Sequence, residues 1–284
     1  MPSVGTLSPK QPDKLALMQP SGVITITTDF GHKGPFAAIM KGVILGRFPT
    51  AKIIDLAHDI PAQWPPEAGF WVSRSYQWFP AGSVHIAIVD PGVGTEREIL
   101  LAECDGHIFM APDNGLLAQL IENRDDPRVY KLALEKLDSL DLPAPSATFH
   151  GRDIFAPVAA ELAAGRLSVE NIAMPTLDWT PGWVDEPEIS TGKVVGVVIT
   201  VDAFGNLISN IDAAMIADFA EPVADIAGHQ VPMQATYGRA RPGDYLALIN
   251  SFGVVEVARA EGSAADGLGS ARGAPLVIRD GYAA

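Results

Sequence analysis

The chain has 284 residues, 48% of them hydrophobic, which is enough for one large or two ordinary globular domains with a substantial core. Its formal net charge is −14 at pH 7 and its Lys and Arg residues form no cluster, so we expect neither nucleic acid nor a membrane as a partner. Cys104 is its single cysteine, which rules out an intramolecular disulfide and a thiolate metal cluster and favours a cytoplasmic protein.

The first 21 residues differ in composition from the rest of the chain. Residues 1–21 mix Lys, Pro, Ser and Gln without the hydrophobic centre that a signal peptide has, and we expect a flexible extension here. No apolar run in the chain reaches the ~18 residues that a membrane-spanning helix needs.

From residue 22 onward, β-branched runs alternate with segments whose apolar residues recur at helical spacing. The expected elements are a strand at 23–28, a helix at 36–48, a strand at 52–56, a helix from 65, strands at 84–89 and 106–110, and a helix from 116. This alternation predicts an α/β domain over residues 22–175 with a doubly wound, mostly parallel sheet.

The four expected strands all run out into a carboxylate: Asp29, Asp59, Asp90 and Asp113. Parallel strands place their carboxyl ends at one edge of the sheet, so we expect these acids to line a single crevice. A turn or helix-capping role explains any one of them equally well, but four together favour a binding site.

Two further features of the sequence could contribute to the same site. Asp90 is followed by the turn Pro-Gly-Val-Gly, whose glycines allow close backbone approach, and then by Arg97. His150 lies between Phe149 and Gly151, just before an expected helix at 156–164. The helix dipole there favours a neutral, basic imidazole, although a purely structural hydrogen-bonding role is also open for His150.

The second half of the chain has a different pattern. Residues 176–190 lose all periodicity and are expected to be a linker. Residues 191–284 then predict a small all-β, barrel-like domain. Its expected strands are 194–201, 231–237, 245–250, 254–258 and 275–278. The loops 202–206 and 250–253 are rich in polar residues, which suits either a site or plain hairpin turns.

Several common site motifs are missing from the sequence. The His residues are not spaced as a zinc-binding pair, the Gly-Val-Gly turn lacks the Lys of a P-loop, and no Gly-x-Ser-x-Gly segment occurs. Asp, His and Arg remain, and these suit general-base work on water with hydroxyls and amines held by carboxylates. We therefore expect no metal site.

Six motifs carry a resemblance to a known family: 27–31, 55–61, 89–95, 111–116, 148–153 and 204–206. In this order they resemble the S-adenosyl-L-methionine (SAM) hydroxide adenosyltransferases, SAM hydrolases that form adenosine and are related to the fluorinase and chlorinase. The resemblance runs from about residue 22 to the C-terminus. It implies SAM as the substrate, no cofactor, and a homotrimer with the site at the subunit interface.

The resemblance also implies roles for individual residues. Asp90, Arg97 and His150 would activate water. The residues that would bind the substrate are Asp29 at the ribose hydroxyls, Asp202 and Ser251 at the methionine part, Phe204, Asn206 and Tyr237 around the adenine, and Phe149.

Two positions separate this chain from the halide-using relatives, which carry Tyr at the position of Asp90 and Ser at that of Gly151. The chain departs from the family pattern at Gly34 and Phe36, where Asp and Tyr are usual, and Phe252 replaces an Arg of the fluorinase. The alternatives are a SAM- or adenosine-binding protein without turnover and a halide-dependent adenosyltransferase.

Overall fold

The computed structural model describes residues 19–281, and these form two compact units. Unit 1 comprises the described residues up to Asp59, with Ser75–Asp113 and Ile121–Trp179. Unit 2 comprises Ile60–Arg74, Asn114–Leu120 and the chain from Thr180 onward. Of the extension expected at 1–21, residues 1–18 lie outside the described part. No helix of the described chain is long and apolar enough to cross a membrane.

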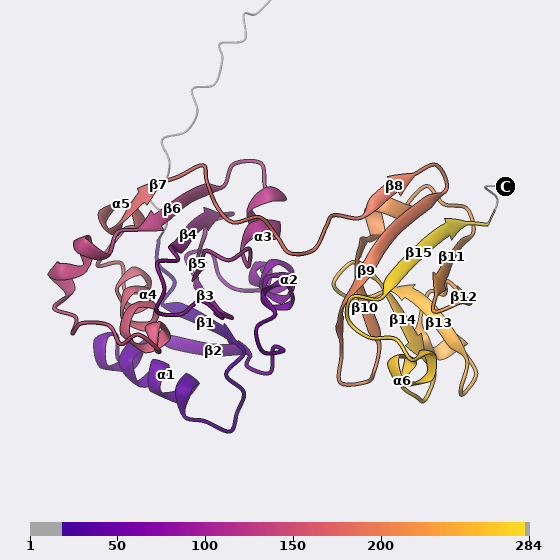
Figure 1. Cartoon of the computed structure of the whole chain (residues 1–284), viewed down its shortest axis with the longest axis horizontal. Helices are drawn as coiled ribbons and strands as arrows, with labels where there is room; N and C mark the ends of the chain where they lie inside the picture. Colours follow the sequence, from indigo (N-terminus) through magenta and orange to yellow (C-terminus); the bar gives the residue numbers. More distant parts are fainter. Residues whose placement is uncertain (1–18, 282–284) are drawn as a thin grey trace, which may run out of the picture. The chain divides into compact units, whose positions relative to one another are not determined.

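Unit 1 is built on a seven-stranded sheet in the order β2-β1-β3-β5-β4-β6-β7 (Figure 1). Neighbours among the first four strands pair in parallel, and β4, β6 and β7 extend the sheet with antiparallel pairs. The strands are β1 (Val23–Thr28), β2 (Lys52–Ala57), β3 (Val84–Ile88), β4 (Ile99–Cys104), β5 (His107–Pro112), β6 (Arg128–Leu132) and β7 (Ala173–Pro175). The expected α/β domain with a parallel core is confirmed, and the antiparallel strands are additional.

The core of unit 1 explains why its central strands read as continuous apolar runs. All six residues of β1 are buried, as is typical of a strand covered on both faces. Ile24 and Ile26 belong to the same hydrophobic cluster as Met40 and Ile44 of α1. The helices of unit 1 are α1 (Phe36–Arg47), α4 (Ala156–Ala163) and α5 (Val169–Ile172). Nearly all of α2 (Pro65–Ser75) belongs to unit 2, and α3 (Ala118–Glu122) is divided between the two units.

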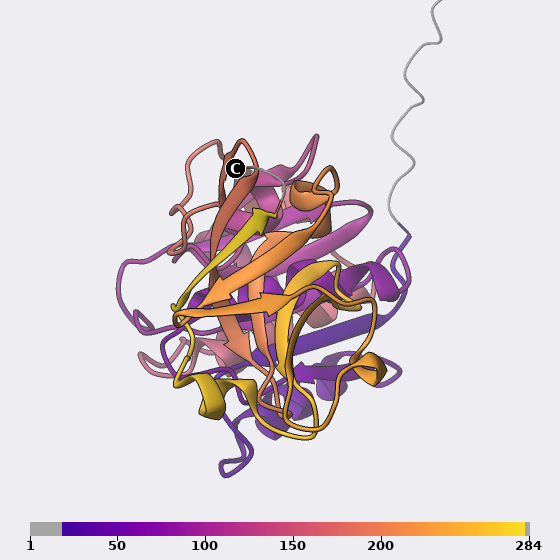
Figure 2. The ribbon, with the colours of Figure 1, turned by 90° about the vertical axis from the view of Figure 1, so that its right-hand side faces the viewer.

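Unit 2 contains the expected β-barrel (Figure 2). Its strands follow the order β12-β11-β15-β9-β10-β14-β13, with β8 beside β9, and every pairing between them is antiparallel. A bridge between Met233 and Ala247 nearly closes the barrel between β12 and β13. The elements are β8 (Glu188–Ser190), β9 (Lys193–Val201), β10 (Leu207–Asp212), β11 (Pro222–Ile226), β12 (His229–Pro232), β13 (Tyr245–Ile249), β14 (Val254–Arg259), α6 (Ala264–Leu268) and β15 (Pro275–Asp280).

One expected strand of the barrel is wrong in its extent. The run 231–237 is not a single strand, because β12 ends at Pro232 and Tyr237 begins a short 3-10 turn, η5 (Tyr237–Arg239). Proline has no N–H to continue the ladder, which explains the end of β12.

Candidate active site

The carboxyl ends of β1, β2, β3 and β5 lie at one edge of the sheet, because these neighbouring strands are parallel. Of the four acids that follow them, Asp29 and Asp90 line one cavity of about 170 Å3. Asp59 lies largely in solvent and pairs with His32 at 3.4 Å, and neither Asp59 nor Asp113 lines that cavity. The crevice thus contains two of the four expected acids.

Arg97 connects Asp90 to His150. Its Nε donates to both carboxylate oxygens of Asp90, at 3.0 and 2.9 Å, and its Nη2 donates to Asp90 Oδ2 as well. The same Nη2 lies 3.1 Å from His150 Nδ1. The side chains of Asp90 and Arg97 are only 5% and 10% exposed, so these charge-assisted bonds are shielded from bulk water.

The turn after Asp90 makes this arrangement possible. Gly94 has φ +77°, and a Cβ on it would lie 2.0 Å from the Ala147 carbonyl oxygen. Only glycine therefore lets the turn approach the segment that leads to His150. Asp153 stabilises that segment. Its carboxylate accepts hydrogen bonds from the Ser146 amide at 2.8 Å, from the Ser146 hydroxyl at 2.7 Å and from Arg152. Arg152 and these Ser146 bonds hold the pKa of Asp153 at about 2.

The protonation state of His150 follows from its partners. Burial lowers the pKa of His150 below 6.5 and Arg97 lowers it further, outweighing Asp90 and Asp153, which raise it. An arginine nitrogen only donates, so Nδ1 of His150 must accept and the ring proton lies on Nε2. The site therefore holds a neutral imidazole whose Nε2–H is a hydrogen-bond donor.

Aromatic rings form the apolar wall of the unit 1 cavity. Phe30, Phe36 and Phe149 contact one another edge to face, with centroids 5.5–6.0 Å apart. All three line the cavity together with Asp29 and His150. Phe149, which the resemblance assigns to substrate binding, therefore lines the same cavity as Asp29.

A buried set of hydrogen bonds centred on His58 supports the turn that carries Asp29. The sequence analysis assigned no role to His58. His58, 3% exposed, contacts Asp55 Oδ1 through Nε2 at 2.9 Å and Thr28 Oγ1 through Nδ1 at 2.8 Å. Thr28 Oγ1 in turn accepts the Phe30 amide at 3.2 Å. These bonds fix the backbone on both sides of Asp29. Both His58 and Asp55 belong to the motif 55–61, which was the available signal.

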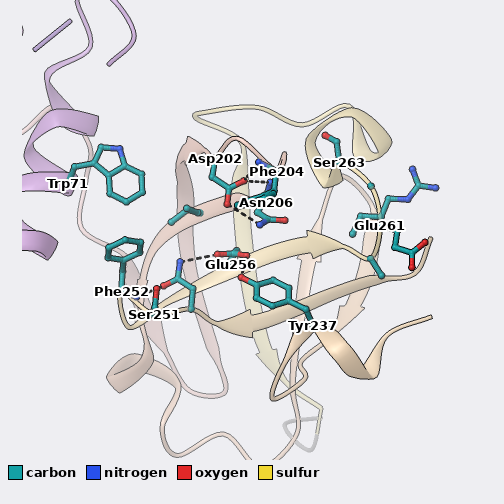
Figure 3. A pocket seen from close by; sticks show the side chains of 15 residues that line it. Trp71, Asp202, Phe204, Asn206, Tyr237, Ser251, Phe252, Glu256, Glu261 and Ser263 are labelled. Carbon is teal, nitrogen blue, oxygen red and sulfur yellow. Dashed lines mark hydrogen bonds between the residues drawn. The ribbon is translucent and has the colours of Figure 1, made fainter. Parts of the chain in front are cut away.

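The predicted substrate residues of the second half line a separate cavity in unit 2, of about 800 Å3 (Figure 3). They are Asp202, Phe204, Asn206, Tyr237 and Ser251. The Asp202 carboxylate accepts the amides of Phe204 and Asn206, both at 2.9 Å, and the Asn206 side-chain amide at 3.0 Å. Phe204 is 79% exposed and presents an open aromatic face.

Sequence reasoning missed Glu256, which also lines the unit 2 cavity. It lies on β14 with only 3% of its surface exposed, between the fully buried Val255 and Val257. A lone acid within an apolar strand run was the signal that could have found it. Among the described residues, no three His, Cys, Asp or Glu side chains are grouped as metal ligands would be.

Comparison with known proteins identifies the family. Residues 24–173 match the model of the SAM hydroxide adenosyltransferase N-terminal domain, and residues 196–277 match that of the C-terminal domain. The chain belongs to the SAM hydroxide adenosyltransferase family.

Relatives in this family include (R)-S-adenosyl-L-methionine hydrolases. The one from Thermus thermophilus is 37% identical, covering 88% of this chain and 96% of its own length. The one from Salinispora tropica is 36% identical, over 93% and 100%. A fluorinase from Actinoplanes sp. is more distant, at 26% identity over 84% of this chain and 90% of its own. A solved structure of an uncharacterized protein from Thermotoga maritima superposes with a TM-score of 0.82 at 31% identity, covering 90% of this chain and 99% of that one.

Two departures from the SAM hydroxide adenosyltransferase pattern prove to be neighbours. A Cβ on Gly34 would lie 2.6 Å from a ring carbon of Phe36, so the two positions are coupled through contact. Gly151 is similarly confined, since a Cβ there would meet Met40 Sδ at 3.1 Å and the Phe149 ring at 3.3 Å. The third departure, Phe252, lines the unit 2 cavity.

Proposed function

We propose that this chain hydrolyses SAM to adenosine and L-methionine by in-line attack of water on the ribose C5′. The observation that carries the proposal is the Asp90–Arg97–His150 arrangement beside the unit 1 cavity. Binding alone needs no water-activating group, so this arrangement favours turnover over a SAM- or adenosine-binding role. Membership of the SAM hydroxide adenosyltransferase family supports the same reaction.

The reaction requires little acid catalysis by the protein. The sulfonium activates C5′, and methionine leaves as a neutral thioether with the electron pair of the broken C–S bond. Water forms the new C–O bond and loses a proton, so each turnover yields adenosine, methionine and one proton. Orientation of the reacting atoms can contribute up to roughly 7–11 kcal/mol, and a positioned base adds about 10²–10⁴-fold.

The contacts divide the work among three side chains. Asp90 orients the water and accepts its proton, since its carboxylate is held by Arg97 at the cavity wall. Arg97 stabilises the hydroxide character that develops on the water and fixes both partners. His150, with its proton on Nε2, donates a hydrogen bond to the attacking oxygen rather than removing a proton from it.

Substrate recognition is proposed for both cavities. Asp29 holds the ribose hydroxyls and Phe149 packs against the sugar. The residues of the unit 2 cavity bind the remainder: Asp202 and Ser251 the methionine part, and Phe204, Asn206 and Tyr237 the adenine.

The proposed assembly is a homotrimer in which neighbouring subunits share each SAM molecule. The lining residues of the two cavities do not overlap. The unit 1 cavity, at about 170 Å3, is smaller than the ~300–1,000 Å3 of ordinary ligand pockets and carries the water-activating groups. The unit 2 cavity has the volume for a ligand of SAM's size. We place the enzyme in the cytoplasm, which suits a chain whose one cysteine, Cys104, is buried and unpaired.

One experiment tests the reaction and separates its alternatives. Purified protein is incubated with SAM, with and without chloride, and the products are separated by chromatography. The proposal predicts adenosine and methionine in both cases. Chloroadenosine that appears with chloride would indicate a halide-dependent adenosyltransferase, and bound but unchanged SAM would indicate a binding protein.

A further inference from the structure

A buried carboxylate joins two segments of the unit 2 cavity. Glu256 Oε1 accepts the Tyr237 hydroxyl at 2.6 Å, and Oε2 accepts the Asn250 Nδ2 at 3.1 Å (Figure 3). Burial raises the pKa of Glu256 and Asp202 adds to this, whereas the two hydrogen bonds lower it. Because Tyr237 and Asn250 belong to different loops, one carboxylate sets the distance between them.

The Tyr237 ring depends on this bond for its place. All three residues of η5 are exposed, so the turn itself has no anchor in the barrel core. The Tyr237 hydroxyl reaches Glu256 on β14 and so ties the ring to a strand of the barrel. Burial, together with Glu256, raises the pKa of Tyr237, which keeps its hydroxyl a donor.

The second loop is held through Asn250. Its Oδ1 accepts the backbone amides of Phe252 at 2.9 Å and Val254 at 3.4 Å. This fixes the orientation of the side-chain amide, whose NH2 must then face Glu256. The turn that carries Ser251 is therefore linked to Glu256 through Asn250.

We propose that Glu256 is a positioning residue: its two carboxyl oxygens hold Tyr237 and the Ser251 turn at the spacing that recognises SAM. The inference rests on the proposed function for the identity of the ligand. A carboxylate only accepts hydrogen bonds, so it satisfies two converging donors, whereas a glutamine would turn its NH2 against one of them. A purely structural position is better filled by an apolar side chain such as the fully buried Val254, which lies two residues away on the same face of β14, since a buried charge is costly.

The test compares Glu256→Gln with a matched buried acid. Glu161 on α4 is 7% exposed and pairs with Arg47 at 3.2 Å and Arg166 at 2.5 Å, and it lines neither cavity. Steady-state kinetics give kcat and KM, and calorimetry gives the Kd of SAM. In Glu256→Gln we expect KM and Kd to rise about tenfold with kcat within twofold of wild type, as for the loss of one hydrogen bond to a charged group. Glu161→Gln lowers the melting temperature and leaves KM and Kd unchanged.

Unchanged KM and Kd in a folded Glu256→Gln variant would overturn the inference, and so would a loss of kcat at constant KM. If Glu256→Gln does not fold, Tyr237→Phe removes the hydroxyl alone and must raise Kd at least threefold; an unchanged Kd overturns the inference. Wild-type protein that binds SAM but releases no adenosine refutes the proposed function, and the Kd comparison still decides the role of Glu256. Wild-type protein that binds no SAM refutes both.

Discussion

The contacts of Arg97 yield a quantitative prediction for Arg97→Lys. Arginine meets both oxygens of Asp90 and Nδ1 of His150 at the same time, which one lysine ammonium cannot do. The charge stays, so Asp90 keeps a counter-ion, but the contact to His150 and one contact to Asp90 are lost. Each hydrogen bond to a charged group contributes about 1.5–3 kcal/mol, so we expect the loss of these two contacts to cost at least ~3 kcal/mol.

That loss corresponds to roughly a 100-fold lower kcat/KM for adenosine release, at about 1.4 kcal/mol per decade. The assay is chromatographic quantification of adenosine over a range of SAM concentrations, with thermal unfolding measured in parallel. Arg124→Lys is the matched control, because Arg124 bonds Asp105 at 2.9 Å and Tyr76 at 3.0 Å and lines neither cavity. Arg124→Lys is expected to keep wild-type turnover. If folded Arg97→Lys retains kcat/KM within threefold of wild type, Arg97 does not organise the site.

Two further predictions concern protonation and the turn. The pKa of His150 is lowered by burial and by Arg97, and protonation of Nδ1 would remove the acceptor that Arg97 contacts, so kcat/KM should fall only as pH drops through a value below 6.5. His150→Gln should remove this acid limb from the pH profile, and a limb at or above pH 6.5 would contradict the assignment. Gly94→Ala should destabilise the fold by more than the ~1–2 kcal/mol of a left-handed alanine, since its Cβ would also meet Ala147. Gly228→Ala is the control at nearly the same φ, +78°, with nothing within 4 Å; equal shifts in urea midpoint for the two variants would show that the close approach is not limiting.

The parallel half of the sheet was predictable because its signals are local. β1 and β3 are β-branched runs buried on both faces, and both ends of β1 agree with the sequence-based range. β4 was missed although Asp105-Gly106, with φ values of 50° and 78°, forms the tight turn that joins it to β5. An Asp-Gly pair between apolar runs is a strong hairpin signal, and here it marks the β4–β5 hairpin.

In the barrel, some strands were not predicted because polar side chains interrupt their apolar pattern. β10 contains Ser209 and Asn210, which read as loop residues. Both are buried and bonded to neighbouring backbone, Ser209 Oγ to the Val255 carbonyl at 2.7 Å and Asn210 Oδ1 to the Val197 amide at 2.8 Å. These hydrogen bonds depend on partners elsewhere in the fold, so strand propensity alone does not predict that these polar residues lie in a buried strand.

The candidate site shows the same division between local and long-range information. Composition and strand ends singled out Asp90 but left a turn role open, and only the family resemblance joined it to Arg97 and His150. The roles of Glu256 and His58 depend on hydrogen bonds between segments far apart in sequence, such as Thr28 with His58 and Tyr237 with Glu256. No spacing rule along the chain predicts those contacts.

The central claim is that Asp90 activates water for attack on SAM, and the most direct test is Asp90→Asn. The variant keeps the shape of the side chain but removes the carboxylate that accepts the proton, so adenosine release should fall at least 100-fold while the Kd of SAM stays within a few-fold. Asp59→Asn, at a 77% exposed side chain outside both cavities, is the matched control and should retain wild-type turnover. Adenosine release by folded Asp90→Asn at the wild-type rate would contradict the account.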